Sequence, residues 1–221
     1  MAPLNLGIDV GTVSAKWALA GSSERLRAAA DLLGMGSRRL VRGKDGREYI
    51  LSEYRRVQGD PLSAVREIIT GLSNLFGENE PGNIILTGSA SGYVAGRLGL
   101  PVENEFKAVA RGVSRLYPEV VNIFEMGGEN SKYIQLSSIN GVVGIADYET
   151  NGDCAAGTGS FMDQQASRLR FDIESVGDIV LEAERTPRIA GRCSVFAKSD
   201  MIHAQQKGYQ PDEILKGLCD A

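Results

Sequence analysis

Apolar positions in the first half of the chain follow two different spacings. Short continuous apolar runs bounded by glycine or polar turns are typical of buried strands. One longer segment starts at Asp60-Pro61, a cap residue followed by proline, and repeats apolar residues at helical spacing as far as Gly77. The predicted strands are Leu4–Val10 and Ala15–Ala20, around a turn at Gly11-Thr12, a hairpin within Arg39–Tyr54, and Asn83–Thr87; a second helix is predicted over Glu105–Leu116.

The second half repeats this order. A strand predicted from Val120 to Met126 ends in Gly127-Gly128, much as the first strand ends at Gly11. Two more strands follow, over Lys132–Leu136 and Val142–Ala146, and then helices over 159–169, 173–184, 195–207 and from 211 onward. A strand, a glycine turn and a strand therefore occur twice. This repetition predicts an α/β protein with two related domains, residues 1–118 and 119–221.

Composition and charge narrow the classes of function. The 221 residues are 43% apolar and 24% charged, which is enough to bury a core without disulfides or metals. The formal net charge is −4, so there is no electrostatic reason to expect nucleic acid or an anionic membrane as a partner. The sequence shows neither an apolar run of bilayer length nor the regions of a signal peptide, and we expect a cytoplasmic protein.

The first glycine turn has residues that can bind phosphate. Asp9 lies near the end of a predicted strand, and Gly11, Thr12 and Ser14 follow it. Backbone N–H groups and hydroxyls in such a turn can donate to phosphate oxygens, and Asp9 can hold Mg²⁺ through water. A plain hairpin with a glycine at its turn explains the same residues, because short glycine motifs are common by chance.

The second glycine turn repeats the arrangement. Glu125 lies near the end of an apolar strand, and Gly127 and Gly128 follow it. Two facing loops can hold phosphates from opposite sides, while their carboxylates hold a metal and orient a water. The GxxxxGK[ST] pattern of a Walker A loop does not occur in the sequence. Two such loops in one chain are more informative than either alone.

The cysteines form a second candidate site. Cys154, Cys193 and Cys219 contain no CxxC pair, and in a reducing cytoplasm we expect no structural disulfide. Cys154 and Cys193 each precede a predicted helix, whose N-terminus favours the thiolate. Two thiolates cannot supply the four ligands of a [4Fe–4S] cluster, but a two-fold symmetric dimer can. Two buried cysteines acting as small apolar residues are the alternative.

Both glycine turns resemble known phosphate loops. GIDVGTVSAKWAL resembles the first phosphate loop of the superfamily of acetate kinase, sugar kinases, Hsp70 and actin, and IFEMGGENSKYIQL resembles its second. The resemblance implies a ribonuclease H-like, actin-like ATPase fold that binds ATP and Mg²⁺. Where superfamily members usually carry Asp, this chain has Glu125, and Asn130 replaces a second Asp that is often present. Because an amide cannot act as a general base, we do not expect fast hydrolysis.

Around the cysteines the resemblance is to one family within that superfamily. CAAGTGSF at Cys154 and CSVFAKSD at Cys193 are similar to activators of 2-hydroxyacyl-CoA dehydratases and to the ATPase subunits of benzoyl-CoA reductases, the BadF/BadG/BcrA/BcrD-type ATPases. This resemblance covers Leu6 to about Leu218. It implies a homodimer in which Cys154 and Cys193 of each subunit bind one shared [4Fe–4S] cluster. It also implies ferredoxin or flavodoxin as electron donor, and a dehydratase or reductase as partner.

The resemblance also implies roles for individual residues. The candidate catalytic carboxylates are Asp9 and Glu125, and the candidate nucleotide-binding residues are Gly11, Thr12, Ser14, Lys16, Glu105, Gly127 and Gly128. A TGG-like adenosine-binding segment, the third element of the superfamily, is not recognised after Lys207. We therefore expect the second domain to be incomplete at its C-terminal end, and this chain by itself to bind ATP weakly or not at all.

Two other functions fit parts of the pattern. A sugar kinase of the same superfamily would use both loops, although Glu125 and Asn130 argue against it. A non-catalytic module for docking or dimerisation in a longer chain would explain why no adenosine-binding segment is recognised in this sequence. Phosphoryl transfer to sugars and calorimetric titration with ATP distinguish these functions from an activator.

Overall fold

The computed structural model describes residues 3–34, 40–77, 80–139, 142–151, 158–191 and 193–221. The chain forms two compact units, each with its own hydrophobic core, and we describe each unit by itself. The first unit comprises Met1–Phe124 and Tyr133–Glu149, and the second comprises Glu125–Lys132 and Thr150–Ala221. The domain boundary expected after residue 118 stays a prediction.

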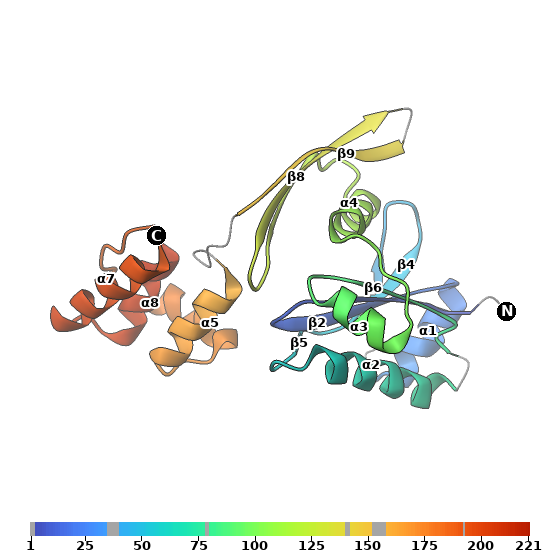
Figure 1. Ribbon diagram of the computed structural model, residues 1–221, viewed down its shortest axis with the longest axis horizontal. Coiled ribbons are helices and arrows are strands. Elements are labelled where there is room, and N and C mark those ends of the chain that lie inside the picture. The colour runs from blue at the N-terminus through green and yellow to red at the C-terminus, as the bar shows by residue number, and fades with distance from the viewer. Residues whose placement is uncertain (1–2, 35–39, 78–79, 140–141, 152–157, 192) are drawn as a thin grey trace. The chain divides into compact units, whose positions relative to one another are not determined.

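The first unit is built on a mixed sheet (Figure 1). Six strands form it: β1 Asn5–Val10, β2 Ser14–Ala20, β3 Leu40–Arg42, β4 Glu48–Leu51, β5 Arg55–Arg56 and β6 Asn83–Thr87. Their order is β3-β4-β2-β1-β6, and β5 also pairs with β2. β1 runs antiparallel to β2 and parallel to β6, so Asp9 lies opposite Lys16 on one side and beside Thr87 on the other.

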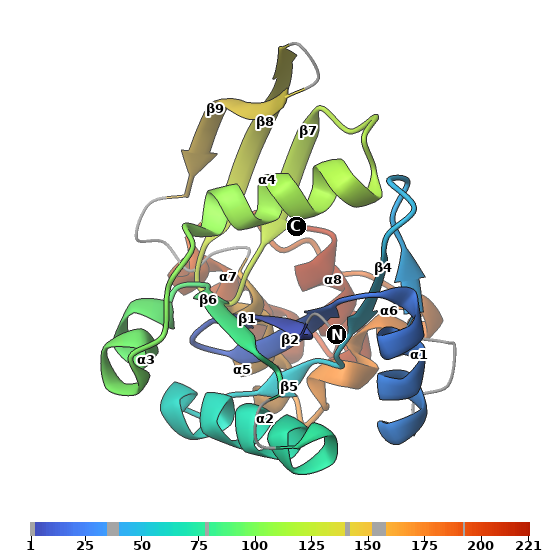
Figure 2. The same ribbon diagram turned by 90° about the vertical axis from the view of Figure 1, so that its right-hand side faces the viewer.

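Helices flank this sheet, and three of the four described in this unit bury apolar side chains in its core. The helices of the unit are α1 Ser23–Leu32, α2 Pro61–Phe76, α3 Ser91–Leu98 and α4 Glu105–Leu116. Asp60 caps α2 by accepting a hydrogen bond from the backbone N–H of Ser63, and Pro61 occupies the first helical turn, as predicted. Figures 1 and 2 show α2 and α4 on opposite sides of the sheet.

A three-stranded sheet packs against α4. Its strands are β7 Asn122–Met126, β8 Ser131–Ile139 and β9 Val142–Thr150, in the order β7-β8-β9. Ala110 of α4 is buried together with Ile134 and Leu136 of β8, and Phe106 and Ile123 pack around them. Alternating residues of β8 therefore face the helix, as expected for a strand with one covered face.

The second unit is mainly helical. Its helices are α5 Gly159–Arg168, the 3₁₀ turn η2 Ile173–Ser175, α6 Val176–Glu182, α7 Ser194–Gln206 and α8 Pro211–Cys219. Phe161, Met201, Ile214 and Leu215 lie in its core. Within the part of the chain that the structure describes, every helix is too short or too polar to cross a bilayer.

The observed elements agree with most of the predicted ones and add others. The hairpins, strand β6 and helices α2, α4, α5, α7 and α8 lie where the apolar spacing predicts them. The prediction that β6 is a buried strand is wrong, because β6 lies at the edge of the sheet, where Leu86 is buried but Ile85 is 42% exposed. Helices α1 and α3 and the short strand β5 were not predicted. The helix predicted over 173–184 is a 3₁₀ turn followed by α6, which ends at Glu182.

Candidate functional site

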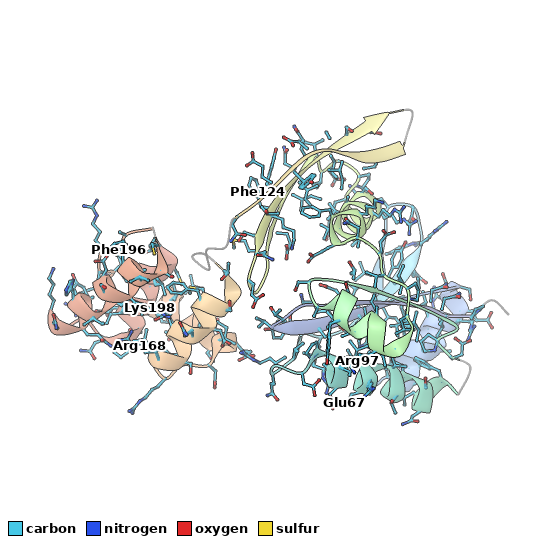
Figure 3. All side chains as sticks on the ribbon, viewed as in Figure 1. Glu67, Arg97, Phe124, Arg168, Phe196 and Lys198 are labelled. Atoms are coloured by element: carbon cyan, nitrogen blue, oxygen red, sulfur yellow. The ribbon has the colours of Figure 1, made fainter. Side chains whose placement is uncertain are left out.

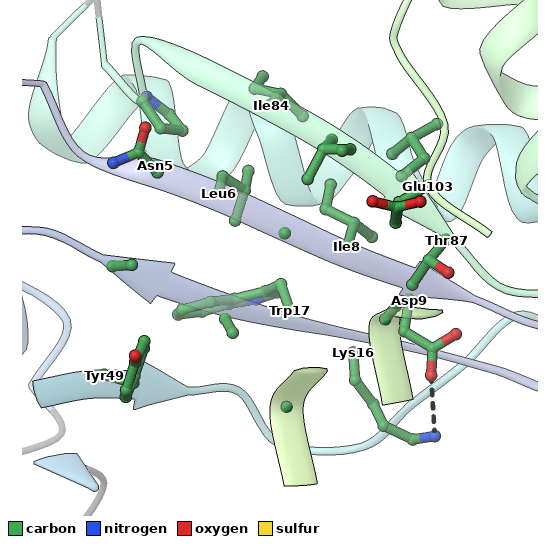
Figure 4. Close-up of a pocket in the computed structure, with 18 of the residues that line it drawn as sticks. Asn5, Leu6, Ile8, Asp9, Lys16, Trp17, Tyr49, Ile84, Thr87 and Glu103 are labelled. Atoms are coloured by element: carbon green, nitrogen blue, oxygen red, sulfur yellow. Dashed lines mark ion pairs between the residues drawn. The ribbon is translucent and has the colours of Figure 1, made fainter. Parts of the chain in front are cut away.

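The first glycine turn joins β1 and β2 and brings five predicted residues together. The turn is closed by a 2.9 Å hydrogen bond from the Gly11 N–H to the Ser14 carbonyl. Strand pairing places Lys16 opposite Asp9, and its Nζ lies 3.7 Å from Asp9 Oδ2, as the dashed line in Figure 4 shows. The two side chains are 50% and 46% exposed, so this ion pair is open to water. Thr12 is exposed at the tip of the turn.

The end of β6 forms a wall beside this turn. Gly88 has a φ of +97°, and a Cβ at this position would lie 2.5 Å from Asp9 Oδ1 and from the Val10 carbonyl oxygen. Only glycine permits so close an approach in that conformation. The Ala90 N–H donates to the Val10 carbonyl at 3.0 Å, and Thr87 Oγ1 is buried without a hydrogen-bond partner among the described residues. The parallel pairing of β1 and β6 therefore adds Thr87 and Gly88 to the site.

An open pocket of about 1130 Å³ adjoins the first turn. Asp9, Lys16, Thr87 and Glu103 line one end of it, where Figure 4 shows them close to one another. The rest of its wall is mostly apolar and comes from one face of the sheet and from α4. The carboxylate and the ammonium group of the first turn are thus both accessible to a ligand.

The second glycine turn joins β7 and β8 and is closed by the same kind of hydrogen bond. The Gly127 N–H donates to the Asn130 carbonyl at 2.8 Å. A Cβ on Gly127 would lie 2.9 Å from that carbonyl oxygen and 3.2 Å from Glu125 Oε1, which makes the turn too tight for a side chain. Lys132 Nζ lies 2.7 Å from Glu125 Oε2. The side chains of Lys132 and Glu125 are 6% and 32% exposed.

Backbone hydrogen bonds tie the second turn to the start of α5. The Gly127 carbonyl accepts from the Gly159 N–H at 2.9 Å, and the Gly128 carbonyl accepts from the Ser160 N–H at 2.8 Å. These two N–H groups belong to the first helical turn and have no partner inside the helix. The second glycine turn therefore caps the helix that follows the Cys154 segment.

Glu105 is the first residue of α4, next to the cap residue Asn104, whose side-chain oxygen accepts from the Lys107 N–H. A carboxylate at a helix N-terminus is favoured by the helix dipole. Its position at the start of α4 is enough to explain why a carboxylate occurs at residue 105. Its predicted contact with a nucleotide stays a prediction.

Cys193 is an exposed free cysteine at the N-cap of α7. Its carbonyl accepts the N–H groups of Phe196 and Ala197, so the residue starts the helix as predicted. Val195 beside it is exposed, and so is Phe196, which Figure 3 labels; both leave apolar surface around the thiol. Lys198 on the same helix turns to the ring of Phe161, with Nζ 5.9 Å from its centroid. The alternative of a buried structural cysteine does not hold for Cys193.

Within the described residues, no three His, Cys, Asp or Glu side chains gather to hold a metal ion. Cys154 lies outside these residues, so the predicted cysteine pair is represented only by Cys193. A cluster shared by two chains takes only two ligands from each. The exposed Cys193 thiol at a helix N-terminus fits such a ligand.

Comparison with protein families shows which family has two glycine turns together with the two cysteine segments. The sequence model of one family matches residues 6–221, which include both glycine turns and both cysteine segments. The chain belongs to the BadF/BadG/BcrA/BcrD ATPase family. The family predicted from the loop and cysteine motifs is therefore confirmed.

Several curated relatives of this chain carry activator names. The (R)-2-hydroxyglutaryl-CoA dehydratase activating ATPase of Acidaminococcus fermentans is 26% identical, over 99% of this chain and 74% of the relative. The 2-hydroxyisocaproyl-CoA dehydratase activator of Clostridioides difficile is 31% identical over 115 residues, which are 52% of this chain and 42% of the relative. The aligned part of this chain thus spans less than half of one relative and about three quarters of the other.

The crystal structure of component A of the Acidaminococcus fermentans dehydratase matches with a TM-score of 0.71 and 24% identity, over 98% of this chain and 73% of that one. A likeness at this identity shows the fold alone. The α/β, actin-like ATPase fold predicted from the sequence is confirmed. Sequence reasoning did not assign Thr87, Gly88 and Lys132 to the two turns; the glycine directly after a predicted strand and the spacing from each carboxylate to a lysine were the available signals.

Proposed function

We propose that this ATPase is an iron–sulfur activator that transfers a low-potential electron to a 2-hydroxyacyl-CoA dehydratase or a related benzoyl-CoA reductase-type enzyme. The observation that carries the proposal is the exposed Cys193 thiol at the N-terminus of α7, in a family whose curated relatives are named dehydratase activators. A buried cysteine would give no such support, because it could not meet a ligand shared with a second chain.

The two glycine turns bind the phosphates of ATP in this proposal. Gly11, Thr12, Ser14 and Lys16 supply donors from the first turn, and Asp9 holds Mg²⁺ through water. The roles of Asp9 and Lys16 are supported by their exposed ion pair, which lines one end of the pocket. Gly127 and Gly128 form the second turn, with Glu125 as its carboxylate, and Glu105 is a further nucleotide contact.

Cys154 and Cys193 of two identical chains hold one [4Fe–4S] cluster, so the acting form is a homodimer. When bound, such a cluster accepts and releases one electron at low potential. Ferredoxin or flavodoxin is the electron donor. The exposed Val195 and Phe196 supply apolar surface for the second chain.

ATP can act on the cysteine segment through the second turn. The carbonyls of Gly127 and Gly128 hold the first N–H groups of α5, and α5 directly follows the segment that contains Cys154. A shift of this turn on phosphate binding would therefore displace the start of α5. Only a difference in affinity between two conformations can drive such a change, and the γ-phosphate supplies it.

The decisive experiment is anaerobic purification followed by iron analysis and electron paramagnetic resonance. We expect a brown protein with a reduced-cluster signal that disappears in Cys154→Ala and in Cys193→Ala. Cys219→Ala is the matched control, because Cys219 is also an exposed free cysteine but ends α8, and partial desolvation and then the charge of Asp220 raise the pKa of its thiol and disfavour a ligating thiolate. A colourless anaerobic wild-type protein would contradict the proposal.

A further inference from the structure

The two glycine turns share one more feature than sequence reasoning recognised. In each, a lysine stands seven positions after the carboxylate, Lys16 after Asp9 and Lys132 after Glu125. Each turn is closed by a hydrogen bond from its first glycine to the residue three positions on. In each, the lysine Nζ pairs with its carboxylate. The cation is therefore a third part of each turn, beside the carboxylate and the glycine.

The two lysine–carboxylate pairs differ in distance and exposure. The Lys16–Asp9 pair is 3.7 Å long and about half exposed, so solvent screens it and it holds neither side chain firmly. The Lys132–Glu125 pair is 2.7 Å long, and the Lys132 side chain is 6% exposed. A buried ammonium group requires an anion or strong acceptors around it. The Lys132 side chain is therefore held in its buried position beside Glu125, whereas the exposed Lys16 side chain can reorient.

The pair also fixes how Glu125 lies. One carboxylate oxygen, Oε2, is bound by Lys132, while Oε1 lies against the turn, 3.2 Å from where a Cβ of Gly127 would be. Without the ammonium group, this carboxylate would present an uncompensated negative charge beside the glycines. A phosphate arriving at the turn would then meet like charge, which weakens binding.

We infer that Lys132 is the positioning residue of the second turn, holding Glu125 in place and cancelling its charge so that the turn accepts a phosphate anion. This inference rests on the proposed nucleotide-binding function. It distinguishes the two carboxylates, because Asp9 is 46% exposed in a 3.7 Å ion pair, whereas Glu125 is 32% exposed in a 2.7 Å ion pair. Lys132 acts through Glu125, and the effect of replacing it depends on whether Glu125 is charged.

The test measures the dissociation constant for the magnesium complex of a non-hydrolysable ATP analogue, by calorimetry, on the chain at its full natural length. We expect Lys132→Met to weaken binding about tenfold or more, and Lys132→Arg to stay within about threefold of wild type. In the double variant Glu125→Gln, Lys132→Met no charge is left unpaired, and binding should be at least about threefold tighter than in Lys132→Met. Lys207→Met, at an exposed lysine of the same unit, is the control.

Thermal unfolding separates misfolding from weakened binding, and the double variant stays informative if Lys132→Met fails to fold. Unchanged binding in Lys132→Met would overturn the inference. A double variant as weak as Lys132→Met would also overturn it, since Lys132 would then contact the phosphate itself. Absence of binding by the wild-type protein would contradict the proposed function as a whole, which is a different outcome from either of these.

Discussion

At position 88 the backbone approaches the first turn more closely than any side chain would permit. Asp9 Oδ1 and the Val10 carbonyl both lie where a Cβ would be, and the φ of +97° favours glycine independently of that contact. Two separate physical constraints therefore select glycine at this residue. Both concern the placement of Asp9, the carboxylate proposed to hold Mg²⁺.

Gly88→Ala should destabilise the protein by roughly 1–3 kcal/mol, because the new Cβ must displace Asp9 or the end of β6. Urea unfolding, monitored by circular dichroism, measures the change in the free energy of unfolding. Gly92→Ala is the matched control, four residues further along in α3, where a Cβ meets nothing within 4 Å. That variant should be neutral or more stable by about 0.5–1 kcal/mol. Equal losses in the two variants would contradict the role given to Gly88.

At the scale of elements, one ion pair holds α8 to the chain before α7. The Arg185 guanidinium donates twice to Glu213, at 2.6 and 2.8 Å, and also lies 5.0 Å from the ring centroid of Tyr209. Glu213 accepts the Gln210 N–H as well, which completes the capping box of α8. The segment that leads to Cys193 is thus anchored to the first turn of α8.

The pH dependence of stability should reveal this anchor. Hydrogen bonds from Arg185 and then from the Gln210 N–H lower the pKa of Glu213 below its ordinary value of 4.5. The stabilisation is therefore complete above about pH 4.5 and is lost as the pH falls towards the lowered pKa. Glu213→Gln should lower the melting temperature by several degrees at pH 7 and by progressively less below pH 4.5.

Arg185→Met provides the partner test, because it removes the same pair from the other side. Its difference from wild type should shrink over the same acidic range. If Glu213→Gln differed from wild type equally at pH 7 and at pH 3.5, the ion pair would not be the source of the stabilisation.

Helix α3 shows that a short helix can be missed when only the sequence of its own segment is considered. Helix α3 contains Gly92 and Gly96, both poor helix formers, and its sequence alone does not predict a helix. Burial of Ser91 and Val94 compensates, and Gly99 ends the helix in the left-handed conformation with a φ of +67°. Packing contributes most of the stability of so short a helix.

At the scale of the whole molecule, the proposal predicts a stoichiometry. A cluster shared by two chains gives about two iron atoms per chain, and removing the iron removes the bonds that join the chains. Anaerobic chelation should therefore convert a dimer into monomers, as measured by light scattering during gel filtration. Cys193→Ala should be monomeric before chelation and unaffected by it. A monomer with four irons per chain, or a dimer that survives chelation unchanged, would contradict the shared site.

The sequence by itself determined the features that depend on neighbouring residues. Short continuous apolar runs predicted the strands, and glycines after carboxylates predicted both turns. The helical pattern after Cys193 predicted that this residue lies at a helix N-terminus. The motif resemblance predicted the family and the fold, which the comparisons confirm. These signals are local, because turn chemistry and capping act over a few consecutive residues.

Only the tertiary structure decided which further residues complete the two turns and how deeply each is buried. Gly88 reaches Asp9 because β6 pairs in parallel with β1, a register set by the buried face of the sheet and not by either segment alone. Lys132 differs from Lys16 at the same spacing because its surroundings bury it. Burial and long-range register arise from the packing of the whole unit, so the sequence around each turn does not specify them.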